Sequence, residues 1–478
     1  MSPTMNRRLS ISPSWLRRWR KTRQTERPVL PLLPVEIWLR IISYLPLPDE
    51  WAKTRLYRVN RLFLDHYIQK RYQDIVLFNP VPYLKGFAKT QYQDEHLTQR
   101  NLSILRDPRR SEVVKTVKIR FKVQYFDYHR GAAEPEDLEV ALRSYLELLR
   151  EGQEIQLPSL SDSPRIYLPR LNKFTLDLSK AHGFGVDPQK LDTSLREHIH
   201  PFLTTHAHLI TTFSISTPQD DPQIGDACFS HLPTFPLLET LSIQISSDRS
   251  STWDGALRFL QRHSTKLKHL KIILLPRLIS ERHSRDTTAS ISASHNWIKQ
   301  VFWSIPMPAL IEFQLFTDIS PVERGPSLDL LLPKSTNSLE RIILSKPIST
   351  PGDLGRLIHH LQSSDGAPQL KELFIPKAEL DLAGLKILAK GLPRLRRLSV
   401  HSIDPKISGA EPSGLNEETL GAAQYFSEWG LEQLDFRHFP LSSGDSVRYR
   451  NAIALVFSNV RVFQGVDRLL WVDNIQVV

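Results

Sequence analysis

Cysteine is nearly absent from this 478-residue sequence, which contains only Cys228. A single cysteine excludes an intramolecular disulfide and any multi-cysteine zinc site, and it fits a reducing compartment. Long apolar runs are also missing, since no stretch approaches the roughly 20 residues that cross a bilayer. We therefore expect no membrane span, a location in the cytoplasm, the nucleus or both, and a buried packing role for Cys228.

Sequence motifs that carry catalysis are absent as well. Gly183 and Gly185 are not followed by the third glycine and the helix start that a phosphate-binding loop requires. A Gly-x-Ser-x-Gly elbow does not occur either. The histidines that cluster have no cysteine or carboxylate at a metal-ligand spacing, so we expect surface or hydrogen-bonded histidines. They are His198, His200, His206, His208, His359 and His360. The sequence thus predicts no catalytic residue, no metal, no cofactor and no enzymatic activity.

Most of the net charge of +11 is carried by the N-terminus. Residues 1–27 contain eight Lys or Arg residues against Glu26 alone, which gives +7 and leaves +4 for the other 451 residues. We expect a basic, disordered tail over residues 1–27. Its composition also resembles a nuclear-import cluster and a mitochondrial transit peptide, and these alternatives stay open.

A compact helical module is predicted between Pro31 and Leu77. Its first helix is expected from about Pro34, as the first helical residue, to Leu45, and is apolar on nearly every side. Asp49 is a suitable N-cap for a second helix, and the spacing of Phe63, Leu64, Tyr67 and Ile68 predicts a third. Three short helices cannot cover this apolar surface themselves, so a partner or adjoining domain must cover it.

This segment resembles an F-box, the module that docks substrate receptors on the Skp-type adaptor of cullin-RING ubiquitin ligases. The resemblance is carried by the Leu-Pro start, the aliphatic residues of the first helix, the Leu-Pro turn with its acidic residue, and the valine of the second helix. The matching residues are Leu33, Pro34, Glu36, Ile37, Ile41, Leu45, Pro46, Asp49 and Val59. The resemblance implies adaptor contacts by Leu33, Pro34, Ile37, Ile41, Leu45, Pro46 and Val59.

A six-residue pattern, apolar-x-x-apolar-x-apolar, recurs along the remaining chain and predicts one strand each time. From the second copy onward the starts are about 25 to 43 residues apart, near the period of leucine-rich repeats. The copies are Val114–Ile119, Leu171–Leu176, Ile210–Ile215, Leu238–Ile243, Leu267–Ile272, Leu310–Leu315, Leu339–Leu344, Leu370–Ile375, Leu395–Val400, Leu431–Phe436 and the weaker Val460–Phe463. A further short strand is expected at Asp74–Phe78.

Apolar stripes of helical spacing lie between several copies, for example at Leu354, Leu357, Ile358 and Leu361. Repeated strand and helix at such a period describe a curved α/β solenoid, and the pattern resembles an irregular leucine-rich-repeat domain. The fold class is therefore α/β, a short three-helix F-box followed by this solenoid. The predicted domains are the tail at 1–27, the F-box module at 28–79, a connecting segment at 80–112 with a helix at His96–Leu105 that Pro108 terminates, and the repeats at 113–478.

Alternate positions of each predicted strand face away from the core, so the composition of that surface follows from the sequence. From Leu171 to Leu431 it contains four Lys or Arg residues and three acidic ones. Because a surface that follows phosphates is basic throughout, nucleic acid is an unlikely partner and a protein substrate is favoured. We name Arg341, Phe374, Arg397 and Asp435 as candidate substrate contacts on the concave face.

Together these resemblances imply a substrate-recognition subunit of an SCF-type cullin-RING E3 ubiquitin ligase. Its partners would be the Skp-type adaptor, the ligase core and an unknown protein substrate. Two alternatives stay open. One is a leucine-rich-repeat scaffold without ligase association. The other is a nucleic-acid or membrane-surface binder that acts through the basic tail.

Overall fold

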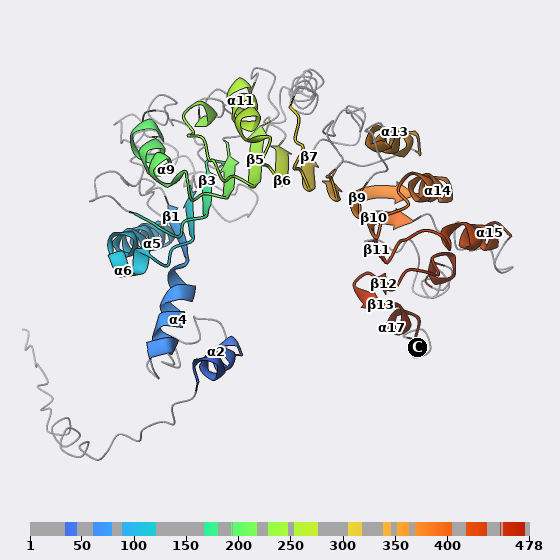
Figure 1. Cartoon of the computed structure of the whole chain (residues 1–478), viewed down its shortest axis with the longest axis horizontal. Coiled ribbons are helices and arrows are strands. Elements are labelled where there is room, and N and C mark those ends of the chain that lie inside the picture. The colour runs from blue at the N-terminus through green and yellow to red at the C-terminus, as the bar shows by residue number, and fades with distance from the viewer. Residues whose placement is uncertain are drawn as a thin grey trace, which may run out of the picture. The chain divides into compact units, whose positions relative to one another are not determined.

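A computed structural model describes most of the predicted elements, in two compact units, Met1–Arg71 and Tyr72–Val478 (Figure 1). The predicted tail at residues 1–27 and the second predicted helix after Asp49 lie outside the described residues. The described residues are 34–44, 61–78, 88–120, 167–179, 193, 195–217, 228–246, 253–275, 305–317, 338–345, 351–362, 369–403, 417–436, 450 and 453–473.

The first unit contains two described helices, α2 (Val35–Ser43) and α4 (Arg61–Tyr72, whose last residue belongs to the second unit). They overlap the residue ranges of the first and third predicted helices. Pro34 precedes α2 as its extended N-cap, with φ −49° and ψ 146°, so its expected place as the first helical residue was wrong by one position. Buried Ile42 and Phe63 form a small core, and the Trp38 ring meets Phe63 edge-on at 5.7 Å between centroids.

The second unit is mixed α/β and contains a 13-stranded, mostly parallel sheet, which confirms the predicted fold class at this level. Its strands follow one another in sequence order, β1 to β13, and only the last pair, β12 and β13, is antiparallel. The strands are β1 (Asp74–Phe78), β2 (Thr116–Arg120), β3 (Lys173–Asp177), β4 (Thr212–Ser216), β5 (Thr240–Ser246), β6 (His269–Leu275), β7 (Glu312–Thr317), β8 (Arg341–Leu344), β9 (Glu372–Leu380), β10 (Arg397–Ile403), β11 (Gln433–Phe436), β12 (Val462–Phe463) and β13 (Val466–Asp467).

Each copy of the six-residue pattern forms one strand, from β2 to β12, and the predicted strand at Asp74–Phe78 is β1. The parallel register aligns the last two apolar positions of neighbouring copies. In β3 and β4, Phe174 lies beside Phe213 and Leu176 beside Ile215. These four side chains are fully or almost fully buried. The repeat of the sequence is therefore converted into continuous apolar rows across the sheet.

Helices cover one side of the sheet and supply the other half of its core (Figure 1). The apolar stripe that begins at Leu354 lies in one of them, with Leu354, Leu357, Ile358 and Leu361 buried. The helices of this unit whose bounds are described are α5 (Ala88–Arg106), α6 (Pro108–Ser111), the π-helix η2 (Leu195–Ile199), α9 (His200–His206), α11 (Asp254–His263), α13 (Pro351–Gln362), α14 (Leu382–Gly391), α15 (Glu417–Phe426) and α17 (Arg468–Asp473).

The predicted connecting helix is α5, which begins before His96 and ends at Arg106, just ahead of Pro108; Pro108 then begins α6. The Asp107 carboxylate caps α6 by accepting a hydrogen bond from the Arg109 backbone N–H at 3.0 Å. Proline is tolerated at the first position of a helix because its missing N–H would have no intrahelical partner there. Pro108 therefore marks both the end of α5 and the start of α6.

Polar side chains satisfy the backbone of the first strand of the sheet. At β1, the Thr98 hydroxyl accepts from the Phe78 N–H at 2.9 Å, and the Asn101 amide donates to the Val76 carbonyl at 2.8 Å. Open strand edges invite pairing with other chains, so these contacts on β1 favour a discrete sheet. Near the C-terminus, the Arg468 guanidinium donates to four carbonyls of the helix and turn that precede β12, those of Ala454, Phe457, Ser458 and Val460, at 2.7 to 3.3 Å.

Two buried histidines make the same contacts in two copies of the repeat that are separated by one further copy. His206 and His263 follow Phe202 and Phe259 by four residues, and each ring Nδ1 lies 2.7 to 2.8 Å from that phenylalanine's carbonyl oxygen. The carbonyl can only accept, so Nδ1 carries the hydrogen. Nε2 then accepts from a backbone N–H, that of Leu168 at 3.0 Å for His206 and that of Phe235 at 2.9 Å for His263. Both rings are therefore neutral structural connectors.

Burial lowers the pKa of His206 and of His263 below the usual 6.5, more than the phenylalanine carbonyls raise it. Below about pH 6.5 these two histidines bind protons in the unfolded chain that they do not bind in the folded chain. Their contribution to the free energy of unfolding is therefore complete above about pH 6.5, and it is lost as the pH falls toward their pKa in the folded state. We expect His206→Leu to lower the free energy of unfolding by about 1–3 kcal/mol at neutral pH, because the Leu168 N–H loses its acceptor.

Urea unfolding across this pH range checks the effect. The variant should show a shallower pH dependence than the wild type, while exposed His359→Gln on α13 should leave both the stability and its slope unchanged. An unaltered slope in His206→Leu would show that the histidine does not carry the effect.

Candidate functional site

An apolar face of α2 lies exposed on the first unit. Ile37, Ile41 and Tyr44 are 44%, 37% and 77% exposed, and they follow one another at spacings of four and three residues. That spacing places them on one side of the helix, while Trp38 and Ile42 pack toward Phe63. A row of large apolar side chains that its own unit leaves exposed is suited to contact with another protein.

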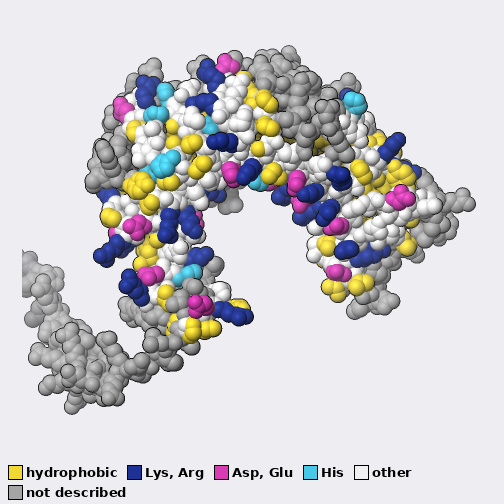
Figure 2. Space-filling model, in the orientation of Figure 1, with side chains coloured by type: hydrophobic (Ala, Val, Ile, Leu, Met, Phe, Trp, Pro, Cys, Tyr) yellow, Lys and Arg dark blue, Asp and Glu magenta, His cyan; other side chains and the backbone are white. Residues whose placement is uncertain are grey.

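A second candidate surface is the side of the sheet away from the helices. We call it the open face, and define it as the side chains of β2 to β11 that alternate with the buried ones. The burial patterns of β2, β3, β4, β8 and β11 show this alternation. Figure 2 shows basic and acidic side chains interspersed on the molecular surface rather than separated into large patches of one sign.

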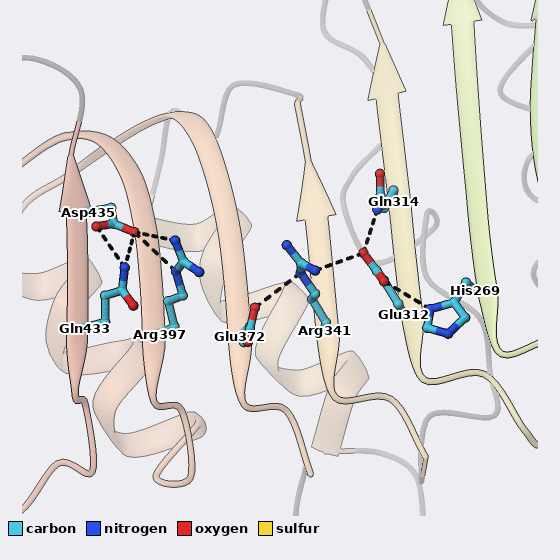
Figure 3. A network of polar contacts seen from close by, with 8 residues as sticks. All are labelled: His269, Glu312, Gln314, Arg341, Glu372, Arg397, Gln433 and Asp435. Atoms are coloured by element: carbon cyan, nitrogen blue, oxygen red, sulfur yellow. Dashed lines mark hydrogen bonds and ion pairs between the residues drawn. The ribbon is translucent and has the colours of Figure 1, made fainter. Parts of the chain in front are cut away.

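Glu312 on β7 is the centre of the polar network on the open face (Figure 3). One carboxylate oxygen accepts from the Gln314 amide at 2.6 Å and lies 3.4 Å from Arg341 Nη1. The other oxygen lies 3.1 Å from His269 Nδ1. Arg341 reaches onward through Nε to Glu372 on β9 at 3.2 Å. The register explains this order, because His269, Glu312, Arg341 and Glu372 are direct partners across β6 to β9.

A second polar group lies at the C-terminal end of the same face (Figure 3). Arg397 on β10 donates from Nε and Nη2 to one Asp435 oxygen on β11, at 3.2 and 3.0 Å. The Gln433 amide donates to both Asp435 oxygens, at 3.2 and 3.0 Å. Asp435 therefore holds the Arg397 guanidinium in a fixed position.

Phe374 on β9 connects these two groups. The guanidinium carbons of Arg341 and Arg397 each lie 4.9 Å from the centroid of its ring. A similar contact occurs on the neighbouring strands, where the Lys271 ammonium lies 4.8 Å from the centroid of Phe316. Cations over aromatic faces contribute about 0.5–1 kcal/mol at exposed sites. The ring and the cations are thus positioned before any partner arrives.

The N-terminal strands carry a different, cationic group. On β2 and β3, Lys118 and Arg120 lie 3.8 and 3.7 Å from Asp177, with Lys173 nearby on the same face. Burial, followed by the charge of Arg120, lowers the pKa of Lys118, and Asp177 partly offsets this. Lys118 and Arg120 share the Asp177 carboxylate and Lys173 adds a third cation, so cations outnumber carboxylates within β2 and β3.

The four predicted substrate contacts, Arg341, Phe374, Arg397 and Asp435, come together on β8 to β11 and touch one another in sequence. Their binding role stays a prediction. The prediction did not single out Glu312, although this carboxylate orders much of the network. It also missed Ile273 and Phe316, because β6 and β7 extend beyond the six-residue pattern; continuing the strand alternation by two residues would have found them.

Of the predicted adaptor contacts, Pro34, Ile37 and Ile41 are exposed. Leu33, Leu45, Pro46 and Val59 lie outside the described residues. Tyr44, the C-cap of α2 and 77% exposed, was not predicted as a contact, although its spacing from Ile37 and Ile41 places it on their side of the helix.

Among the residues that the structure describes, no three His, Cys, Asp or Glu side chains are grouped to hold a metal ion, and no helix is long and apolar enough to cross a membrane. Cys228 is buried, as expected. No protein-family model matches the chain, and no curated protein matches it in sequence. The two surfaces described above therefore carry the functional argument.

The central position of Glu312 has a measurable energetic consequence. Its side chain is only 15% exposed and receives three donors, so its pairing with Arg341 is screened less than an open surface pair. In a double-mutant cycle of Glu312→Gln and Arg341→Met, we expect a coupling near the upper end of the 0.2–1 kcal/mol range found for surface pairs, about 1 kcal/mol.

The pair of Lys268 and Glu239 is a suitable control, because it is 2.6 Å apart but 43% and 48% exposed. Its coupling, from Lys268→Met and Glu239→Gln, should be smaller despite the shorter distance. Equal couplings for the two pairs would show that the network adds nothing to the isolated ion pair.

Proposed function

We propose that the chain is the substrate-receptor subunit of an SCF-type cullin-RING E3 ubiquitin ligase. In this proposal the first unit is an F-box that docks on a Skp-type adaptor, and the second is a leucine-rich-repeat solenoid that binds a protein substrate. The observation that carries the proposal is the exposed apolar face of α2, in a segment whose sequence resembles an F-box.

The α2 face has the chemistry that such docking requires. Ile37 and Ile41 present aliphatic side chains to solvent, and Tyr44 extends the same side. Packing of Trp38 against Phe63 fixes an adjacent side of the helix, so the exposed side is presented on a formed scaffold. An apolar helix face laid into a hydrophobic groove is a common mode of recognition, and full burial of an isoleucine contributes about 1.5–3 kcal/mol.

The second unit supports the receptor part of the proposal. Strands in sequence order, parallel and in a shared register, are what stacked repeats produce, since each repeat contacts only its neighbours. The open face then offers side chains from many strands to one ligand. Its aromatic and arginine residues, with interspersed acids, are of the kind enriched at protein interfaces.

In this role the chain needs no catalytic residue of its own. The ligase core would transfer ubiquitin, and the receptor would hold a substrate lysine near the charged conjugating enzyme. Positioning two reactants converts an encounter in solution into an effectively intramolecular step, which alone raises the rate strongly. The location that follows from this role is the cytoplasm, the nucleus or both.

Co-purification of the full chain with a Skp-type adaptor tests the proposal. Wild type should bind, and the double variant Ile37→Asp, Ile41→Asp should not, because two charges would be placed in an apolar interface. Both side chains are more than one-third exposed, so the variant should still fold. Its tryptophan fluorescence and thermal unfolding should match those of the wild type.

Leu237→Asp is the matched control, since it places a charge on a 51% exposed leucine of the second unit. It should bind the adaptor as the wild type does. A wild-type chain that fails to bind any Skp-type adaptor would refute the proposal, as would undiminished binding by the Ile37→Asp, Ile41→Asp variant.

A further inference from the structure

The open face has an apolar strip through its middle, from β6 to β9. Ile273 and Phe316 are direct partners across β6 and β7, and Ile343 and Phe374 are direct partners across β8 and β9. All four side chains are partly exposed, in contrast to the buried residues that alternate with them. The strip therefore offers apolar contact area on a surface that is otherwise polar.

The charges around this strip are already matched among themselves. Arg341 lies between the carboxylates of Glu312 and Glu372, and Arg397 is held by Asp435. With Lys271 over Phe316, the group has three cations and three carboxylates, so its net charge is zero. An anionic ligand would meet these carboxylates beside each arginine, and their repulsion would offset the attraction of the guanidinium groups.

An uncharged apolar side chain meets no such obstacle. It can pack on Ile343 and the exposed parts of the two phenylalanine rings while every ion pair stays in place. The paired arginines then act as fixed walls, because ordered side chains lose little entropy on binding. At protein interfaces, aromatic and arginine residues are among those whose truncation to alanine most weakens binding.

Resting on the proposed receptor function, we infer that the strip formed by Ile273, Phe316, Ile343 and Phe374 binds an unmodified segment of the substrate through an uncharged aromatic or aliphatic side chain. Recognition at this strip does not require a phosphate group. The cationic strip of Lys118, Arg120 and Lys173, where Asp177 is the one carboxylate within β2 and β3, is where an acidic ligand would instead be attracted.

The probe for this inference is a phage-displayed library of random unmodified 12-residue peptides, with a matched synthetic phosphoserine peptide library, both presented to the full-length protein. Enriched unmodified peptides should share an aromatic or large aliphatic residue. Their affinity, measured by fluorescence anisotropy, should change less than about twofold between low and high salt, because no net charge is neutralised.

Two substitutions should each weaken the selected peptide about tenfold or more, Phe374→Ala and Ile343→Thr. The second keeps a β-branched side chain and hence the strand, so it tests the strip even where Phe374→Ala lowers stability. Lys173→Gln, on the same face but outside the strip, is the control and should leave the affinity unchanged.

Enrichment of acidic or phosphorylated peptides alone, with binding that weakens steeply in salt and is lost in Lys173→Gln, would overturn the inference. Recovery of no peptide that depends on Phe374 or Ile343 would overturn it as well. The outcome is separable from adaptor docking: peptide binding without adaptor binding would refute the ligase proposal and leave the strip as a peptide site.

Discussion

Alternate burial along each strand is the constraint from which the rest of the second unit follows. In β3, Phe174 and Leu176 enter the core while Lys173 and Thr175 stay on the open face, and β4 repeats the arrangement with Phe213 and Ile215. Because the side-chain period of a strand is two, a shift by one residue would exchange the two sets. The apolar positions therefore fix the register, and the register decides which polar side chains become neighbours on the open face.

The two candidate surfaces differ in how they treat charge. On α2 the exposed face is aliphatic and aromatic, with no ionic partner required for contact. On the open face the arginines are pinned by Glu312, Glu372 and Asp435 before any ligand binds. This difference suits a division of labour in which one surface docks on a constant partner and the other selects a substrate. Both roles belong to the proposal of a ubiquitin-ligase receptor.

The repeated strands could be predicted because each needs only a local apolar pattern, and eleven copies reinforced one another. The network around Glu312 could not, because its donors come from β6, β7 and β8 and meet only through the register. A finer signal was available for the buried histidines. In both copies the histidine follows a Phe-Leu pair and precedes the next six-residue pattern by four residues, as in Phe202, His206 and Ile210. Pro108 shows the limit of local reasoning, since a breaker can equally open a new helix.

Amide hydrogen exchange of the full chain, with and without a purified Skp-type adaptor, tests the central claim most directly. The proposed receptor function predicts new protection in α2, Val35–Ser43, and unchanged exchange in β6 to β11, where the open face would still await a substrate. Unchanged exchange in α2 at saturating adaptor, or protection confined to the sheet, would contradict the account.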